Sequence, residues 1–242
     1  MQNYCKTIGV LAAATALVAG NTQAAPEYEI HTGYSSLYLF RGLELGQDLG
    51  EVGVDVANEW NGLTLSAGFW GAMFNTTNHD SNLDNELDLY GEVSKDFGFL
   101  TASVGYIYYW NFSSVDGVDK NDQEVYFSVS RDFGFASAYV TYFWNVDPDT
   151  SGNDGYTELG FSKSWELNQC LTLNASTNVG YIIAADNFTA NTTKVSLDWA
   201  FAEHAKLSPY VAVSIALGED KNTAWYETNN EFVAGTILSV GF

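Results

Sequence analysis

The sequence predicts an all-β protein, a transmembrane up-and-down antiparallel β-barrel of about 12 strands. Three observations carry this prediction. Apolar residues alternate with polar or small ones over stretches of about ten residues, which is the period of a strand. Short and long connections alternate along the chain, as in barrels with short periplasmic turns and longer external loops. Aromatic residues collect near the ends of the stretches, where such barrels carry interfacial girdles.

The N-terminal segment has the parts of a secretory signal peptide. Lys6 supplies positive charge, residues 8–19 form a short apolar run, and small residues lead to a cleavage site near Ala24. We therefore expect two parts in an exported protein, a cleaved signal peptide over residues 1–24 and a barrel over residues 25–242.

Composition excludes two classes of protein. The sequence contains 9 Lys and Arg against 30 Asp and Glu, for a formal net charge of −21. Phosphate binding requires a basic stripe, so no nucleic-acid partner is expected. Aromatic residues make up 15% of the chain, which is far too many for a disordered acidic protein.

The strands follow from the alternation, taken in chain order. In the second predicted strand, Val52, Val54 and Val56 share one face while Glu51 and Asp55 share the other, and no helical period fits. The third and fourth strands repeat this pattern, and the last one carries it to the C-terminus. The predicted ranges are 28–40, 51–60, 63–74, 86–96, 99–110, 123–133, 135–144, 156–166, 170–183, 193–202, 206–217 and 231–242.

The connections between these ranges divide into two kinds. Five are short, beginning with Asn61-Gly62, Phe97-Gly98 and Phe133-Gly134. Six are long and polar, and they cover residues 41–50, 75–85, 111–122, 145–155, 184–192 and 218–230. A soluble sandwich or lipocalin-like barrel is the alternative, but the polar face carries too many carboxylates for a closed soluble core.

The final strand resembles a known assembly signal. Leu238, Val240 and Phe242 alternate and end on an aromatic residue. This ending resembles the β-signal by which the assembly machinery recognises bacterial outer-membrane barrels. The resemblance implies two partners, that machinery and the lipid bilayer.

Two further segments resemble one family. The stretch 33–42, read Gly-Tyr-Ser-Ser-Leu-Tyr-Leu-Phe-Arg-Gly, and the later phrase 66–71, read Ser-Ala-Gly-Phe-Trp-Gly, are similar to motifs of the TorF-like (Gcw_chp) family of Gram-negative outer-membrane proteins. The resemblance implies location in the bacterial outer membrane and the barrel fold rather than an activity.

Strand parity predicts an acidic lumen. The candidates for its lining are Arg41, Asp55, Glu86, Asp88, Glu92, Glu124, Lys194 and Asp198, with only Arg41 and Lys194 opposing the acids. Such a wall favours cations, so we expect a porin-like passive channel for small cationic or neutral solutes. The alternative is a structural or adhesive surface barrel with a filled lumen. For Arg41 we favour a latch to one or two acids over a constriction residue that orients solutes.

Four basic residues lie near the short turns. Lys95, Arg131 and Lys163 have lipid-facing parity, and Lys206 lies at the same end. Long cationic side chains at this position reach phospholipid headgroups, which places the short turns on the periplasmic side.

One loop matches the spacing of a calcium-binding loop. Asp147, Asp149, Ser151 and Glu158 occupy the first, third, fifth and twelfth positions of an EF-hand pattern. Strands rather than helices flank it and Pro148 stiffens it, so Ca²⁺ is a candidate ligand and no other cofactor is expected.

Catalysis finds little support in the sequence. An outer-membrane lipid hydrolase needs a Ser–His pair, but His31 and Ser35 lie about 13 Å apart along one strand. His79 falls in a loop and His204 in a turn. We therefore expect a protein that is not an enzyme, with a lipid hydrolase as the weaker alternative.

Overall fold

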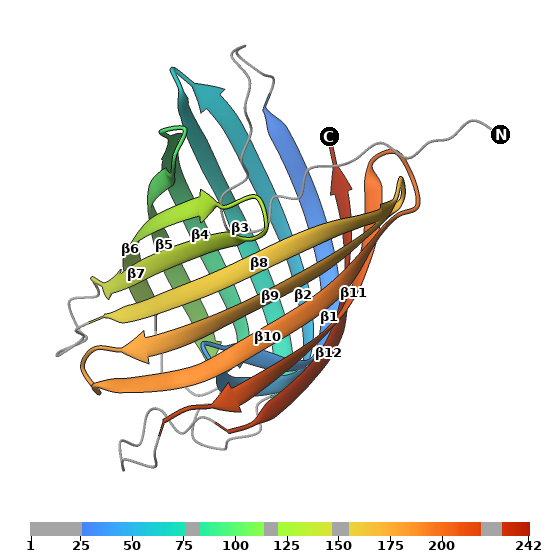
Figure 1. The fold of residues 1–242 in the computed structure, drawn as a ribbon. Helices are drawn as coiled ribbons and strands as arrows, with labels where there is room; N and C mark the ends of the chain where they lie inside the picture. The colour runs from blue at the N-terminus through green and yellow to red at the C-terminus, as the bar shows by residue number, and fades with distance from the viewer. Residues whose placement is uncertain (1–25, 76–82, 114–120, 147–154, 219–228) are drawn as a thin grey trace.

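The computed structural model describes residues 26–75, 83–113, 121–146, 155–218 and 229–242. They form a closed antiparallel barrel of twelve strands in which β1 pairs with β12, so the predicted fold class and strand number are confirmed (Figure 1). Within the described ranges, no helix is long and apolar enough to cross a membrane. The strands are β1 Glu27–Phe40, β2 Leu43–Trp60, β3 Leu63–Asn75, β4 Leu83–Asp96, β5 Thr101–Ser113, β6 Asp122–Asp132, β7 Ser137–Asn145, β8 Tyr156–Asn168, β9 Leu171–Ile182, β10 Asn187–Ala200, β11 Ala205–Ala216 and β12 Glu231–Gly241.

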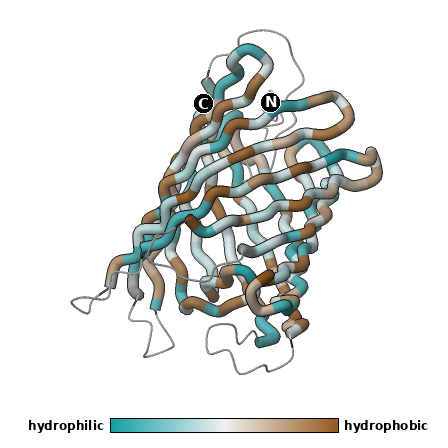
Figure 2. The backbone as a smooth tube through the Cα atoms, turned by 90° about the vertical axis from the view of Figure 1, so that its left-hand side faces the viewer, coloured by the Kyte–Doolittle hydropathy of each residue, from teal (hydrophilic) through white to brown (hydrophobic). Residues whose placement is uncertain are grey.

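Alternation along each strand separates an inner wall from an outer wall, and Figure 2 shows the change in hydropathy from residue to residue. On β1, Tyr28 and Ile30 are about half exposed on the outside, whereas Glu29 is buried on the inside. The outer wall is therefore apolar and the inner wall polar, which suits a barrel in lipid. Tryptophans exposed on the outer wall lie near strand ends, as the girdle prediction requires, and they are Trp60, Trp110, Trp144, Trp165 and Trp199.

The five connections that were predicted to be short lie at one end of the barrel. Asn61 and Gly62 have φ angles of 52° and 75°, the left-handed pair that a two-residue hairpin of type I′ requires. The barrel closes at the same end, where Phe242 N donates to Tyr28 O at 2.9 Å.

Two of the six predicted long connections are wrong. Residues 41–50 do not form a loop, because β1 turns at Arg41 and Gly42 and β2 begins at Leu43. Residues 184–192 likewise belong mostly to β10, which begins at Asn187. Both segments are rich in polar side chains, which hid their strand character.

Candidate functional site in the barrel lumen

The hairpin of β1 and β2 crosses the lumen. Arg41, in its turn, forms a bidentate ion pair with Glu124 of β6, with N···O distances of 2.8 and 2.6 Å. In the order of a twelve-strand barrel, β6 and β7 lie opposite β1. The hairpin therefore spans from one wall to the other, and Figure 1 shows its blue tip bent across the lower opening.

Aromatic rings enclose the guanidinium of Arg41. Its Cζ lies 4.7, 4.5 and 4.4 Å from the ring centroids of Phe40, Phe143 and Tyr156. Tyr109 donates to the paired Glu124 carboxylate at 2.9 Å. Cation–π contact and charge-assisted hydrogen bonds reinforce each other in this desolvated position. We call the Arg41–Glu124 pair with these rings the latch.

The base of the hairpin packs against β3. The Tyr38 ring centroid lies 5.5 Å from that of Trp70 and 5.0 Å from that of Phe74. Leu49 and Ala72 complete this buried cluster. Apolar burial at the base and ion pairing at the tip fix the hairpin at both ends.

Neutral donors bind several carboxylates of the inner wall. Tyr90 donates to Asp55 at 2.5 Å, and Tyr126 donates to Glu92 at 2.9 Å. Glu51, Glu59 and Glu158 follow the same rule, with Trp70, Thr64 and Tyr139 as their donors. Glu86 is buried on this wall, and Asp88 shares its face of β4. A hydroxyl or indole donor satisfies a carboxylate without adding positive charge.

The donor rings lie over glycines of the neighbouring strand. Gly105 pairs directly with Tyr126, and a Cβ at Gly105 would come within 2.2 Å of that ring. Similar contacts join Gly68 to Tyr90, Gly160 to Tyr139, Gly235 to Tyr210 and Gly53 to His31. Sequence reasoning missed these pairs. Their only signal is an inward-facing glycine that lies opposite an aromatic residue, and this can be recognised only once the register of the strands is known.

Three lysine or arginine side chains face the lumen within the described part of the chain. Besides Arg41, Lys194 Nζ lies 4.0 Å from the Tyr210 centroid, and Lys206 Nζ lies 3.8 Å from Asp198 Oδ2. The expectation that only Arg41 and Lys194 oppose the acids was therefore wrong, because β11 turns Lys206 inward.

The candidate calcium loop is only partly visible. Asp147, Asp149 and Ser151 lie outside the described residues. Glu158 lies on β8 and accepts hydrogen bonds from Tyr139 at 2.5 Å and Tyr156 at 3.3 Å. Among described residues, no group of three or more His, Cys, Asp or Glu side chains is placed to hold a metal ion.

The residues of the weaker hydrolase alternative have other partners. His31 Nε2 lies 3.4 Å from Asp55 Oδ2, while Ser35 Oγ donates to the backbone oxygen of Leu37. The structure thus does not bring this histidine and serine together. His79 lies outside the described residues, and His204 is exposed in a turn.

The C-terminal residues of the expected assembly signal share the outer wall. Leu238 and Phe242 are exposed there, with Phe242 at the rim of the short-turn end. Val240 lies between them on β12. All three are thus presented to the membrane side of the barrel.

Comparison with known proteins places the fold. The sequence matches the family described as "Bacterial protein of unknown function (Gcw_chp)" over residues 21–236. No curated protein matches it. The chain is similar to the COG4313 outer membrane channel from Pseudomonas putida F1, with 12% identity, a TM-score of 0.57, and coverage of 94% of this chain and 100% of that one.

A second solved structure, a NanC porin, has 12% identity and a TM-score of 0.57, over 88% of this chain and 98% of that one. A KdgM porin has 12% identity and a TM-score of 0.50, over 88% and 99% of the two chains. At such identities the likeness is one of fold. The fold is that of bacterial outer-membrane barrels, and it confirms the expected location of the chain in the outer membrane.

Proposed function

The chain belongs to the Gcw_chp family of bacterial proteins, and we propose that it is a porin-like outer-membrane channel for passive passage of small cationic or neutral solutes. The observation that carries the proposal is the hydrogen bonding of the inner carboxylates. Glu92 and Glu158 are held by tyrosine hydroxyls rather than by lysine or arginine, and Asp55 accepts from Tyr90 at one oxygen while His31 lies 3.4 Å from the other. Porins and channels with the same fold support a channel role.

The sign of the inner wall follows from this arrangement. Within the described residues, only Arg41, Lys194 and Lys206 add positive charge from lysine or arginine to an inner wall with many carboxylates. Arg41 and Lys206 each pair with an acid, so they cancel single charges rather than form a positive zone. A wall of one sign attracts solutes of the opposite sign and repels those of its own.

In this proposal, the constriction of the route lies at the hairpin that the latch holds across the lumen. The hairpin crosses to β6 at the end opposite the short turns, and its tip is held by Glu124 and three aromatic rings. A solute must pass beside the hairpin, which restricts passage to small molecules. We assign Arg41 the role of positioning the hairpin.

Conductance in planar bilayers tests this function. Purified wild-type protein is expected to give small current steps, with a reversal potential in a KCl gradient that shows preference for K⁺. Arg41→Gln is expected to give larger steps of the same selectivity, because the hairpin loses its ion pair. Lys163→Gln, which changes an outer-wall cation, serves as the matched control and leaves step size unchanged. Anion-selective steps contradict the proposal.

A filled structural or adhesive barrel is the second candidate, and the crossing hairpin is the observation that favours it. Tyr38, Trp70 and Phe74 pack together inside the wall beneath that hairpin. Absence of current steps in both wild type and Arg41→Gln supports this candidate and excludes the channel. Steps that appear only in Arg41→Gln indicate a barrel closed by its hairpin.

We also propose that the chain is not an enzyme and that Ca²⁺ is a candidate ligand of the loop at 147–158. Lipid deacylation in micelles that is lost in His79→Ala would contradict the first statement. Calorimetry tests the second, because equal Ca²⁺ heats for wild type and Asp149→Ala dismiss the loop as a site.

Recognition of Phe242 by the assembly machinery is a third proposal, since the C-terminal alternation faces the membrane side of β12. Deletion of Phe242 is expected to reduce the amount of folded barrel in the outer membrane. An unchanged amount of folded barrel would show that the assembly machinery does not recognise Phe242.

A further inference from the structure

Three cations face the lipid on consecutive hairpins at the periplasmic rim. Lys95 lies on β4, Arg131 on β6 and Lys163 on β8. Each is directly opposite an alanine of the next strand, in the pairs Lys95 with Ala102, Arg131 with Ala138, and Lys163 with Ala175. A methyl group leaves space beside each cation on the outer wall. The rim therefore carries an arc of basic side chains, each beside a small cross-strand neighbour.

These cations have no acidic partner among the described residues, unlike Arg41 and Lys206 in the lumen. Lys95 Nζ lies 5.3 Å from the Phe97 centroid, and Arg131 Cζ lies 5.1 Å from the Phe133 centroid. Lys163 Nζ donates to Gly134 O at 2.8 Å. Each side chain is thus held at the rim by a ring or a carbonyl, which leaves its charge available to an anion.

The neighbouring acids are engaged elsewhere. Asp96 Oδ1 accepts the backbone N–H of Gly98 at 2.6 Å, and Asp132 Oδ1 accepts that of Gly134 at 2.7 Å. Each aspartate follows a cation directly in the sequence and so points to the other side of its strand. They shape the two turns and leave the outer side to Lys95 and Arg131.

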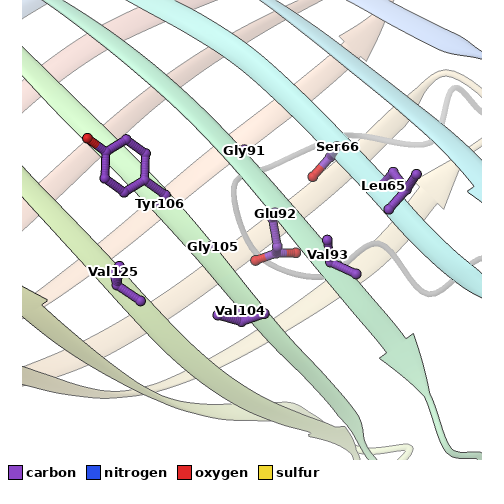
Figure 3. Close-up of a pocket in the computed structure, with 9 residues that line it drawn as sticks. All are labelled: Leu65, Ser66, Gly91, Glu92, Val93, Val104, Gly105, Tyr106 and Val125. Atoms are coloured by element: carbon purple, nitrogen blue, oxygen red, sulfur yellow. The ribbon is translucent and has the colours of Figure 1, made fainter.

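An apolar hollow lies on the outer wall next to Lys95. Its volume is about 480 Å³, and Figure 3 shows the strands and side chains that line it. Gly91 lacks a side chain at this point, and a Cβ there would meet nothing closer than Ser66 O at 3.6 Å. The outward side chains of its lining are Leu65, Val93, Val104, Tyr106 and Val125.

Register places the hollow directly above the first cation. Val93 precedes Lys95 by two residues on β4, and its cross-strand partner Val104 follows Ala102 by two residues on β5. Two residues of strand span about 7 Å, so hydrocarbon in the hollow continues toward a headgroup beside Lys95. Arg131 lies two strands away and, because Ala102 pairs with Val129, two residues further along β6. The two Cα atoms are therefore about 12 Å apart, and both long side chains can reach the same headgroup.

We propose that Lys95, Arg131 and this hollow bind one anionic glycerophospholipid of the periplasmic leaflet. Its phosphate contacts the two cations, and one acyl chain lies against Gly91 between Val93 and Tyr106. The charge of the site complements an anionic headgroup, and the hollow is too apolar for a free phosphate. Lys163 extends the arc and contributes long-range attraction. This site is independent of the lumen and of any transport through it.

Native mass spectrometry of the full chain tests the site. Detergent-purified protein is mixed with equal amounts of phosphatidylglycerol and zwitterionic phosphatidylethanolamine, and the retained lipid is counted. Wild type is expected to retain phosphatidylglycerol preferentially. Each lost charge near the surface weakens binding about fivefold, so K95Q/R131Q is expected to lose about 25-fold. Lys221→Gln, which removes the same charge in the connection between β11 and β12, is the control and retains wild-type binding.

Gly91→Leu tests the contact of the acyl chain with the hollow separately from the contact of the headgroup with the cations. Its side chain enters the hollow, and retention of phosphatidylglycerol is expected to fall several-fold while migration of the folded barrel on unheated gels stays unchanged. Equal retention in wild type and K95Q/R131Q would overturn the proposal. Loss of binding in K95Q/R131Q with full binding in Gly91→Leu would overturn the proposal that an acyl chain occupies the hollow. It would show that the lipid binds through its headgroup alone.

Discussion

The inner and outer faces of the wall formed by β3 to β6 use the same residue types for different purposes. Inside, Gly105 lies under the Tyr126 ring, whose hydroxyl binds Glu92. Outside, Gly91 lies at an open hollow beside Tyr106. The first glycine makes room for a ring of the protein, and the second makes room for the surrounding lipid.

The two faces also differ in the surroundings that they give to cations. Arg41 reaches the inner wall and is enclosed by Glu124 and aromatic rings. Arg131 on the outer wall has a single ring contact and is exposed. Parity along a strand thus decides whether a residue fixes the lumen or meets the membrane, and matched substitutions on the two faces test this difference.

The largest difference in the free energy of unfolding is expected between substitutions of the two arginines. Arg41→Gln removes one partner of a buried bidentate pair and, among the described residues, leaves the Tyr109 hydroxyl as the remaining side-chain donor to Glu124, which typically costs about 3 to 5 kcal/mol. Arg131→Gln removes an exposed side chain and should change the free energy of unfolding by less than about 0.5 kcal/mol. Urea titration in lipid vesicles measures both values. Equal values for the two variants would show that the latch does not stabilise the barrel.

A smaller difference is expected between the two glycines. In Gly105→Ala, the new Cβ collides with the Tyr126 ring, and overpacking of this kind costs about 2 kcal/mol. Gly91→Ala meets only Ser66 O at 3.6 Å, an ordinary contact, and should be nearly neutral. The same urea titration compares the two. A neutral Gly105→Ala would mean that the ring moves aside without loss of its bond to Glu92.

The sequence was sufficient for the faces of the strands because alternation is a local property. The facing of Asp55, Glu92 and Lys95 follows from the period of two alone. Alternation failed at residues 41–50, where polar Glu44, Gln47 and Asp48 resemble a loop but extend β2. Their strand character depends on pairing with β1, which composition does not reveal.

The partners inside the lumen were beyond sequence reasoning for a different reason. Arg41 was expected to bind an acid, but Glu124 lies 83 residues away and was one of many candidates. Choosing it requires knowing that the hairpin bends inward and reaches the opposite wall. Likewise, Gly105 meets Tyr126 only in the observed register, and a shift of one residue would turn the ring outward.

The smallest difference is expected between two tyrosine hydroxyls. Tyr126→Phe removes the donor to Glu92 on the inner wall, and a hydrogen bond to a charged group contributes about 1.5 to 3 kcal/mol. Tyr106→Phe removes an outer-wall bond to Gln123, which is neutral and exposed, so about 0.5 to 1 kcal/mol is expected. Both substitutions keep the ring, so packing is unchanged and urea titration reports the hydroxyls alone. A larger loss of unfolding free energy in Tyr106→Phe than in Tyr126→Phe would contradict this expectation. It would mean that the inner carboxylates do not depend on neutral donors, which is the basis for the negative inner wall.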